Sequence, residues 1–137
     1  MPTTEIKNVL VIDDNETDLL IAKIVIEKTG YKGNIITKSS GKAALEYLAS
    51  IQNSPEKFPN IIFLDINMPV INGFVFMDEF EKMPYEFTKH IKLAMLTSSD
   101  NRSDMDRFNN SEFVIDFVSK PITFESFNAL AAKYQEL

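Results

Sequence analysis

The sequence predicts a single α/β domain in which strands alternate with helices. Short apolar runs, without the polar alternation of a half-buried strand, recur along the chain. Each run is followed by a polar turn and then by apolar residues at helical spacing. Such runs are typical of parallel strands that are covered on both faces. The 137 residues suffice for one packed core. We therefore expect one domain over residues 1–137, with its core at about 7–136.

Five segments are predicted to be strands, and each ends at polar residues. They are 9–12, 34–37, 61–64, 91–96 and 113–118. Apolar residues at helical spacing follow them in five further segments: 19–28, 43–48, 74–83, 101–110 and 124–134. Pro84 is expected to end the third helix. The segment 101–110 has only Met105 and Phe108 as large apolar residues, which predicts a short, weakly anchored helix.

This alternation implies a parallel sheet with right-handed crossovers and helices on both faces. The expected architecture is a flavodoxin-like (βα)5 three-layer sandwich, with a five-stranded parallel sheet in the order 2-1-3-4-5. In that order the ends of the first and third strands lie side by side. Asp13, Asp14 and Asp65 would then meet at the carboxyl edge of the sheet. Thr97 and Lys120, after the fourth and fifth strands, would face the same crevice.

Composition excludes several classes of function. The chain has no Cys, so disulfides, thiolate zinc sites and cysteine nucleophiles are absent. Its first residues contain neither a signal peptide nor a membrane span. The net charge is -6, and Lys and Arg are scattered along the sequence. We expect a cytoplasmic protein without membrane association or direct contact with nucleic acid.

Three carboxylates close together repel one another, so they favour a bound cation or a retained proton. Oxygen ligands without His or Cys suit a hard ion, and a few carboxylates with water and phosphate suit Mg²⁺. A carboxylate beside such an ion can attack phosphorus and form an aspartyl phosphate. Asp65 fits the nucleophile, with Thr97 and Lys120 stabilising the phosphoryl oxygens.

From about Lys7 to its end, the chain resembles a receiver domain of the two-component response regulators. The matching positions are the acidic pair Asp13-Asp14, the phosphoacceptor Asp65, the switch hydroxyl Thr97 and the lysine followed by a cis-type proline, Lys120-Pro121. The resemblance implies phosphoryl transfer from a phosphohistidine of a sensor histidine kinase or histidine phosphotransfer protein. It also implies that the protein catalyses only its own phosphorylation and dephosphorylation.

The same resemblance implies a set of Mg²⁺ ligands. Asp14 and Asp65 would bind the ion directly, the backbone carbonyl of Asn67 would be the third protein ligand, and Asp13 would act through water. No output domain is expected after the receiver. A stand-alone receiver acts by docking to another protein, here an unknown downstream target, or by passing its phosphoryl group onward.

Two positions depart from the commonest receiver pattern. Phe117 stands where the family often has a switch Tyr, so its ring can turn inward but cannot donate a hydroxyl hydrogen bond. Ser98 stands where a smaller Ala is common. We expect phosphorylation to draw the Thr97 hydroxyl toward the phosphoryl group, with Phe117 filling the vacated space. The face made by the fourth helix, fifth strand and fifth helix would be remodelled.

Three other functions share parts of this pattern. A flavodoxin-like flavin carrier needs a phosphate loop after the first strand, where this chain has acidic residues that repel an anion. A haloacid-dehalogenase-type phosphatase needs a second Asp two residues after its nucleophile, and here that residue is Asn67. Asn67 is also a candidate for orienting the water that removes the phosphoryl group. The remaining alternative is a receiver-like protein-binding module that works without phosphorylation.

Overall fold

The computed structural model describes residues 6–98, 106–109 and 111–137. Within these residues, five parallel strands form one sheet in the order β2-β1-β3-β4-β5, as the sequence predicted. The strands are β1 (Asn8–Ile12), β2 (Asn34–Lys38), β3 (Ile61–Asp65), β4 (Lys92–Thr97) and β5 (Val114–Ser119). Each boundary lies within one residue of the predicted one at either end. The expected α/β fold is therefore confirmed.

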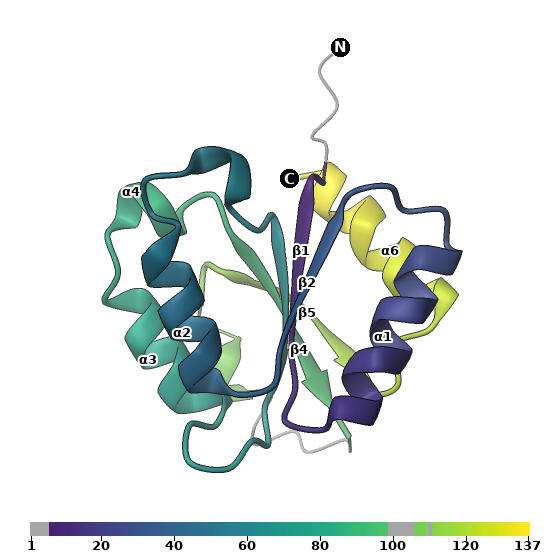
Figure 1. Ribbon diagram of the computed structural model, residues 1–137, viewed down its shortest axis with the longest axis horizontal. Coiled ribbons are helices and arrows are strands. Elements are labelled where there is room, and N and C mark those ends of the chain that lie inside the picture. Colours follow the sequence, from purple (N-terminus) through teal and green to yellow (C-terminus); the bar gives the residue numbers. More distant parts are fainter. Residues whose placement is uncertain (1–5, 99–105, 110) are drawn as a thin grey trace.

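Helices cover both faces of the sheet and complete three layers (Figure 1). The labelled helices are α1 (Glu16–Lys28), α2 (Gly41–Ser50), α3 (Gly73–Glu81), α4 (Tyr85–Thr88) and α6 (Phe124–Gln135), with a 3-10 helix at Pro55–Lys57. In Figure 1, α1 and α6 lie on one side of the sheet, and α2, α3 and α4 lie on the other. Among these helices, none is long and apolar enough to cross a membrane.

The predicted third helix is wrong at its end. It stops at Glu81, three residues before Pro84, and Pro84 instead precedes the short helix α4. The fixed φ of proline suits the start of a helix, which explains why the residue opens α4 rather than merely closing α3. Of the predicted helix 101–110, only 106–109 are among the described residues, and 106–108 are helical. Met105 lies outside them.

The uniformly apolar strands follow from the two covered faces of the sheet. Side chains alternate along a strand, so Leu10 and Ile12 point to one core, whereas Val9 and Val11 point to the other. The first core lies under α2, α3 and α4, and the second lies under α1 and α6. Burial of each such side chain contributes roughly 1.5–3 kcal/mol, which makes the central strands a rigid platform for the loops at their ends.

Side-chain caps start the helices that leave the carboxyl edge of the sheet. Asn15 caps α1 by accepting the Asp18 N–H, and Ser40 caps α2. Asn72 caps α3, and Thr123 opens α6 in a capping box. Each cap satisfies N–H groups that the helix leaves unpaired and contributes about 1 kcal/mol. The turns at this edge are thus defined locally.

Asparagine side chains join the strands at the opposite, amino edge. Asn34 donates to the Asn8 carboxamide oxygen (2.9 Å), and the Asn60 oxygen accepts the backbone N–H groups of Lys7 (2.8 Å) and Asn8 (3.1 Å). The Asn60 amide reaches the Tyr134 hydroxyl oxygen of α6 at 3.1 Å. This asparagine network, made of Asn8, Asn34, Asn60 and Tyr134, links β2, β1, the start of β3 and α6.

Candidate acidic site at the carboxyl edge of the sheet

The structure brings three carboxylates together where β1 and β3 end. β1 pairs directly with β3, so Asp13, which follows β1, lies beside Asp65, the last residue of β3. Asp13 and Asp65 are only 2% and 3% exposed, whereas Asp14 is exposed. One carboxylate oxygen from each of the three lies within 4.8 Å of the others. Two buried charges at this spacing require compensation.

Backbone N–H groups hold one oxygen of each buried carboxylate. The Asn15 N–H donates to Asp13 Oδ1 (2.9 Å), and the Asn67 N–H donates to Asp65 Oδ1 (3.1 Å). Both are Asx turns, in which the side chain bonds the backbone two residues further on. The turns leave Oδ2 of each carboxylate to face the crevice, where a cation can reach both.

The Lys120 ammonium occupies that position. Its Nζ lies 3.1 Å from Asp13 Oδ2 and 3.4 Å from Asp65 Oδ2, and it also lies 3.2 Å from Asp18 Oδ2 of α1. Burial alone would lower the pKa of Lys120, but the hydrogen bond to Asp13 and the charges of Asp65 and Asp13 outweigh it and raise that pKa above its usual range. The ammonium is therefore a fixed positive charge between the two buried acids.

Asp65 remains under-compensated. Burial raises the pKa of its carboxyl, and the charge of Asp13 adds to the rise, although the Asn67 N–H and Lys120 oppose it. Asp13, Asp18 and Asp65 share one ammonium, and Asp14 adds a further carboxylate to the cluster. The donor set of the cluster is all oxygen, which fits a hard divalent ion such as Mg²⁺ better than a softer metal.

Thr97 and Lys120 lie at the same edge of the sheet, at the ends of the neighbouring strands. Thr97 ends β4 and is 9% exposed, and its carbonyl accepts the Lys120 N–H at 2.8 Å. The Lys120–Pro121 peptide bond is cis. Ser98, which follows Thr97, is exposed. The ends of β1, β3, β4 and β5 thus surround one acidic crevice.

Comparison with known proteins gives the family of this chain. The family model for the response regulator receiver domain matches residues 9–132. The chain belongs to that family. Its residues are 30% identical to a structurally solved two-component response regulator from Cytophaga hutchinsonii, covering 97% of this chain and 99% of that one, with a TM-score of 0.85.

Curated relatives extend the comparison. The chain is 26% identical to the probable methanogenesis regulatory protein FilR2 of Methanothrix harundinacea, over 93% of this chain and 81% of that protein. It is 32% identical, over 85% of its length, to part of the sensor histidine kinase CheAY of Helicobacter pylori. The chain spans only 13% of that kinase. Receiver domains are signalling phosphoacceptors rather than classical enzymes, and they bind Mg²⁺ at an acidic pocket.

Phe117 lies away from the acidic crevice of the receiver domain. It pairs with Met95 of β4, two positions before the strand ends, and its ring is partly buried against the core under α2 and α3. Asn67 is exposed at the start of the loop after β3. The structure therefore places Asp13, Asp14, Asp65 and Lys120 together, with Phe117 in the layer below.

Sequence reasoning missed Asp18 as a member of the site. Its backbone N–H donates to the Asn15 side-chain oxygen at the start of α1, which is a purely local contact. Its side chain, however, reaches Lys120 of a strand end more than 100 residues away in sequence. Its spacing was a usable signal. A residue in the first helical turn after Asp14 lies close to the acidic edge, so its side chain is within reach of the site.

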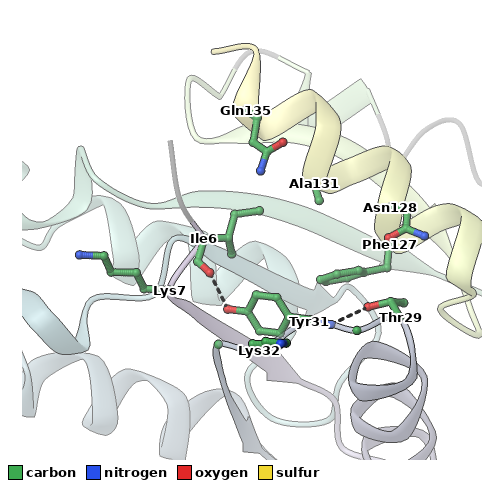
Figure 2. A pocket seen from close by; sticks show the side chains of 11 residues that line it. Ile6, Lys7, Thr29, Tyr31, Lys32, Phe127, Asn128, Ala131 and Gln135 are labelled. Atoms are coloured by element: carbon green, nitrogen blue, oxygen red, sulfur yellow. Dashed lines mark hydrogen bonds between the residues drawn. The ribbon is translucent and has the colours of Figure 1, made fainter. Parts of the chain in front are cut away.

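The receiver domain also has a hollow of about 630 Å³ at the amino edge of the sheet, far from Asp65 in the fold. Figure 2 shows Tyr31 and Phe127 in its wall, where the Tyr31 hydroxyl donates to the Ile6 carbonyl at 2.9 Å. Lys7 and Lys32 line it, and no carboxylate does among the described residues. The carboxylates and the hollow thus occupy opposite ends of the strands.

Proposed function

We propose that this receiver domain accepts a phosphoryl group on Asp65 from a phosphohistidine, in a reaction that depends on Mg²⁺. The observation that carries the proposal is the position of the Lys120 ammonium between the buried Asp13 and Asp65 carboxylates, with Asp14 within ligand distance of both. This arrangement combines a nucleophilic carboxylate, a fixed positive charge and a set of oxygen ligands for a divalent ion.

In the transfer, a carboxylate oxygen of Asp65 forms a bond to phosphorus as the bond from phosphorus to the histidine nitrogen breaks. The bonding electron pair stays on the imidazole, and the product is an aspartyl phosphate. Lys120 donates to a phosphoryl oxygen from the side of Asp13, and the Thr97 hydroxyl donates to another. The chain order supports this proposal, since Thr97 ends β4 and Lys120 follows β5 at the edge where β3 ends in Asp65.

The ion would be held by Asp14, Asp65 and the backbone carbonyl of Asn67, with Asp13 acting through water. When bound, Mg²⁺ neutralises charge that develops on the phosphoryl oxygens. The protein groups contribute the remaining stabilisation: the Asn15 and Asn67 N–H groups keep the two buried carboxylates oriented before any ion or phosphate arrives. This preorganisation lowers the cost of assembling the reactive arrangement.

The partner that supplies the phosphoryl group is a sensor histidine kinase or a histidine phosphotransfer protein. Similarity to part of a sensor histidine kinase supports this class of partner. The response is a shift of Thr97 toward the phosphoryl group and of Phe117 into the vacated space. It changes the face formed by β5, α6 and the expected helix over 101–110, which a downstream protein then recognises.

Incubation with acetyl phosphate and Mg²⁺ tests the transfer. The expected result is one adduct of about 80 Da by intact-protein mass spectrometry, absent in Asp65→Asn and absent when EDTA removes the metal. Asp78→Asn is the control, because Asp78 is an exposed acid on α3. Loss of the adduct in both variants, or its retention in Asp65→Asn, would contradict Asp65 as the acceptor. An unmodified wild-type protein would favour a binding module that works without phosphorylation.

The conformational response has a separate measurement. Backbone NMR of the phosphorylated protein is expected to show shifts at Thr97 and Phe117 and across β5 and the first turns of α6. Shifts confined to the loop after Asp65, with 111–119 unchanged, would rule out a response transmitted through Phe117.

A further inference from the structure

Asp18 shares the Lys120 ammonium with the two buried acids of the site. Its Oδ2 lies 3.2 Å from Lys120 Nζ, between the distances of 3.1 Å for Asp13 and 3.4 Å for Asp65. Its surroundings differ, because the Asp18 side chain is 39% exposed whereas the other two are 2% and 4% exposed. The ammonium is thus drawn inward by two buried carboxylates and outward by one that faces solvent.

The first turn of α1 holds Asp18 in this position. The Asn15 cap accepts the Asp18 backbone N–H at 3.0 Å, which leaves the Asp18 side chain free to reach the crevice. Ile21 of α1 and Pro121 line a small pocket of only about 20 Å³, together with Asp18 and Lys120. Asp18 therefore meets Lys120 where α1 lies close to the segment after β5.

Asp18 competes with a phosphoryl group for the N–H donors of Lys120, because the ammonium has only a few of them. A lysine ammonium has three N–H donors, and here three carboxylates accept from it or pair with it. Asp13 and Asp65 lie in a buried, weakly screened environment and suffice to locate the ammonium. The half-exposed Asp18 adds little to that location, yet it occupies a donor and offsets part of the positive charge.

We propose that Asp18 is a positioning residue that acts through Lys120: it draws the ammonium outward and limits how strongly Lys120 stabilises phosphoryl transfer to Asp65. This inference rests on the proposed function of Asp65. Removing the Asp18 charge should release an N–H donor toward the acceptor and reduce repulsion of an anionic phosphate donor. Both effects raise the rate of phosphorylation, which makes Asp18 a brake built into the site.

The test compares second-order rate constants for phosphorylation by acetyl phosphate at saturating Mg²⁺. Asp18→Asn is expected to react about 1.5- to 5-fold faster than wild type, the range that a partly exposed ion pair supports, and Asp18→Glu is expected to remain near wild type. Glu16→Gln is the matched control. It removes the same charge from the same helical turn, and Glu16 makes no ion pair with Lys120 in the described part of the chain.

A second readout needs neither metal nor phosphate. In metal-free protein, the ¹⁵N and ¹H resonances of the Lys120 ammonium should shift in Asp18→Asn and stay in place in Glu16→Gln. Asp18→Ser replaces Asp18→Asn if that variant does not fold, as judged by circular dichroism. An unshifted ammonium resonance, or a rate in Asp18→Asn equal to or below that of Glu16→Gln, would overturn the role of Asp18.

The two readouts also separate this inference from the proposal beneath it. A wild-type protein that gains no phosphoryl group would refute phosphorylation at Asp65 and, with it, the brake on that reaction. The ammonium resonances would still report whether Asp18 positions Lys120. A phosphorylated wild type whose rate is unchanged by Asp18→Asn would refute the inference alone.

Discussion

Phe74 and Phe108 stack face to face, with ring centroids 4.7 Å apart and ring planes 5° from parallel. Phe74 is the second residue of α3, shortly after the turn that follows Asp65, whereas Phe108 lies in the segment that leads to β5. The Arg107 guanidinium lies 3.4 Å from the centroid of the Phe74 ring. These contacts connect the start of α3 with the residues that precede β5.

The stack predicts a measurable coupling between the two rings. Phe74→Leu and Phe108→Leu should each lower the free energy of unfolding, and the double variant should lose about 0.5–1.5 kcal/mol less than the sum of the two, because only one stack exists to be lost. Urea denaturation of the four proteins measures this coupling. Strict additivity would mean that each ring packs independently against the core.

A side chain at Gly73, the first residue of α3, is expected to destabilise the fold. The Gly73 N–H donates to the Ile66 carbonyl (2.8 Å), and a Cβ added there would lie 3.0 Å from the Ile66 Cα. Because backbone rather than a flexible side chain must move, Gly73→Ala should lower the free energy of unfolding by about 1–3 kcal/mol. Val75→Ala, at an exposed position of the same helix, serves as the control. Equal stabilities of the two variants in denaturant titrations would disprove the close approach.

At Val70, by contrast, replacement by glycine is expected to stabilise the fold. Val70 has φ of 65° and is 99% exposed, and it is the middle residue of a γ-turn closed by the Ile71 N–H and the Pro69 carbonyl (2.7 Å). A β-branched residue is strained at this φ by about 1–2 kcal/mol, whereas glycine is not but costs roughly 0.5–1 kcal/mol of additional chain entropy.

Val70→Gly should therefore raise the free energy of unfolding by about 0.5–1 kcal/mol. The same substitution at Val75, on the exposed face of α3, should lower it by about 1 kcal/mol or less, because a helix interior disfavours glycine. Thermal and urea denaturation measure both. If the two substitutions are equally destabilising, the valine at position 70 is unstrained.

Asp65 predicts how the stability of the metal-free protein depends on pH. Its pKa is raised in the folded state, mainly by burial, so its contribution to stability is present below the unfolded-state pKa and is lost as pH rises through the folded-state pKa. At neutral pH, above the ordinary pKa of an aspartate, burial of this carboxyl therefore destabilises the fold. Asp65→Asn should be more stable than wild type in EDTA at pH 7.

That advantage should shrink as the pH falls, because the wild-type carboxyl then becomes protonated in the folded state and the unfolded state alike. Urea denaturation at several pH values measures the difference, with Asp78→Asn as the control for a solvent-exposed acid. A constant difference at all pH values would show that the substitution acts through packing or hydrogen bonding and not through the Asp65 charge.

The strands and the acidic edge were predictable because they follow from short-range patterns and one topological rule. Uniform apolar runs marked Ile61–Asp65 and its neighbours, and parallel strands place their carboxyl ends at one edge. The sequence alone therefore predicts that Asp13 and Asp65 lie together. The family resemblance added the roles of the site residues, which remain predictions.

Other features depended on contacts that no local pattern encodes. The reach of Asp18 to Lys120 depends on the rotation of α1 against the segment after β5. The break between α3 and α4 depends on where Phe80 and Phe87 find space in a shared core. Valine rarely adopts a positive φ, so nothing in the sequence indicates this conformation at Val70. Tertiary packing decides each case.

The asparagine network gives the molecule a fixed end. Asn8, Asn34 and Asn60 hold the amino edge of the sheet through satisfied amides, and Tyr134 extends the network to α6. When a rearrangement starts at the carboxyl edge, the amino edge should therefore stay in place, and α6 should tilt about its end at Tyr134. Displacements of α6 should be largest near Phe124 and smallest near Tyr134. A partner that binds the beginning of this helix would therefore distinguish the two states best.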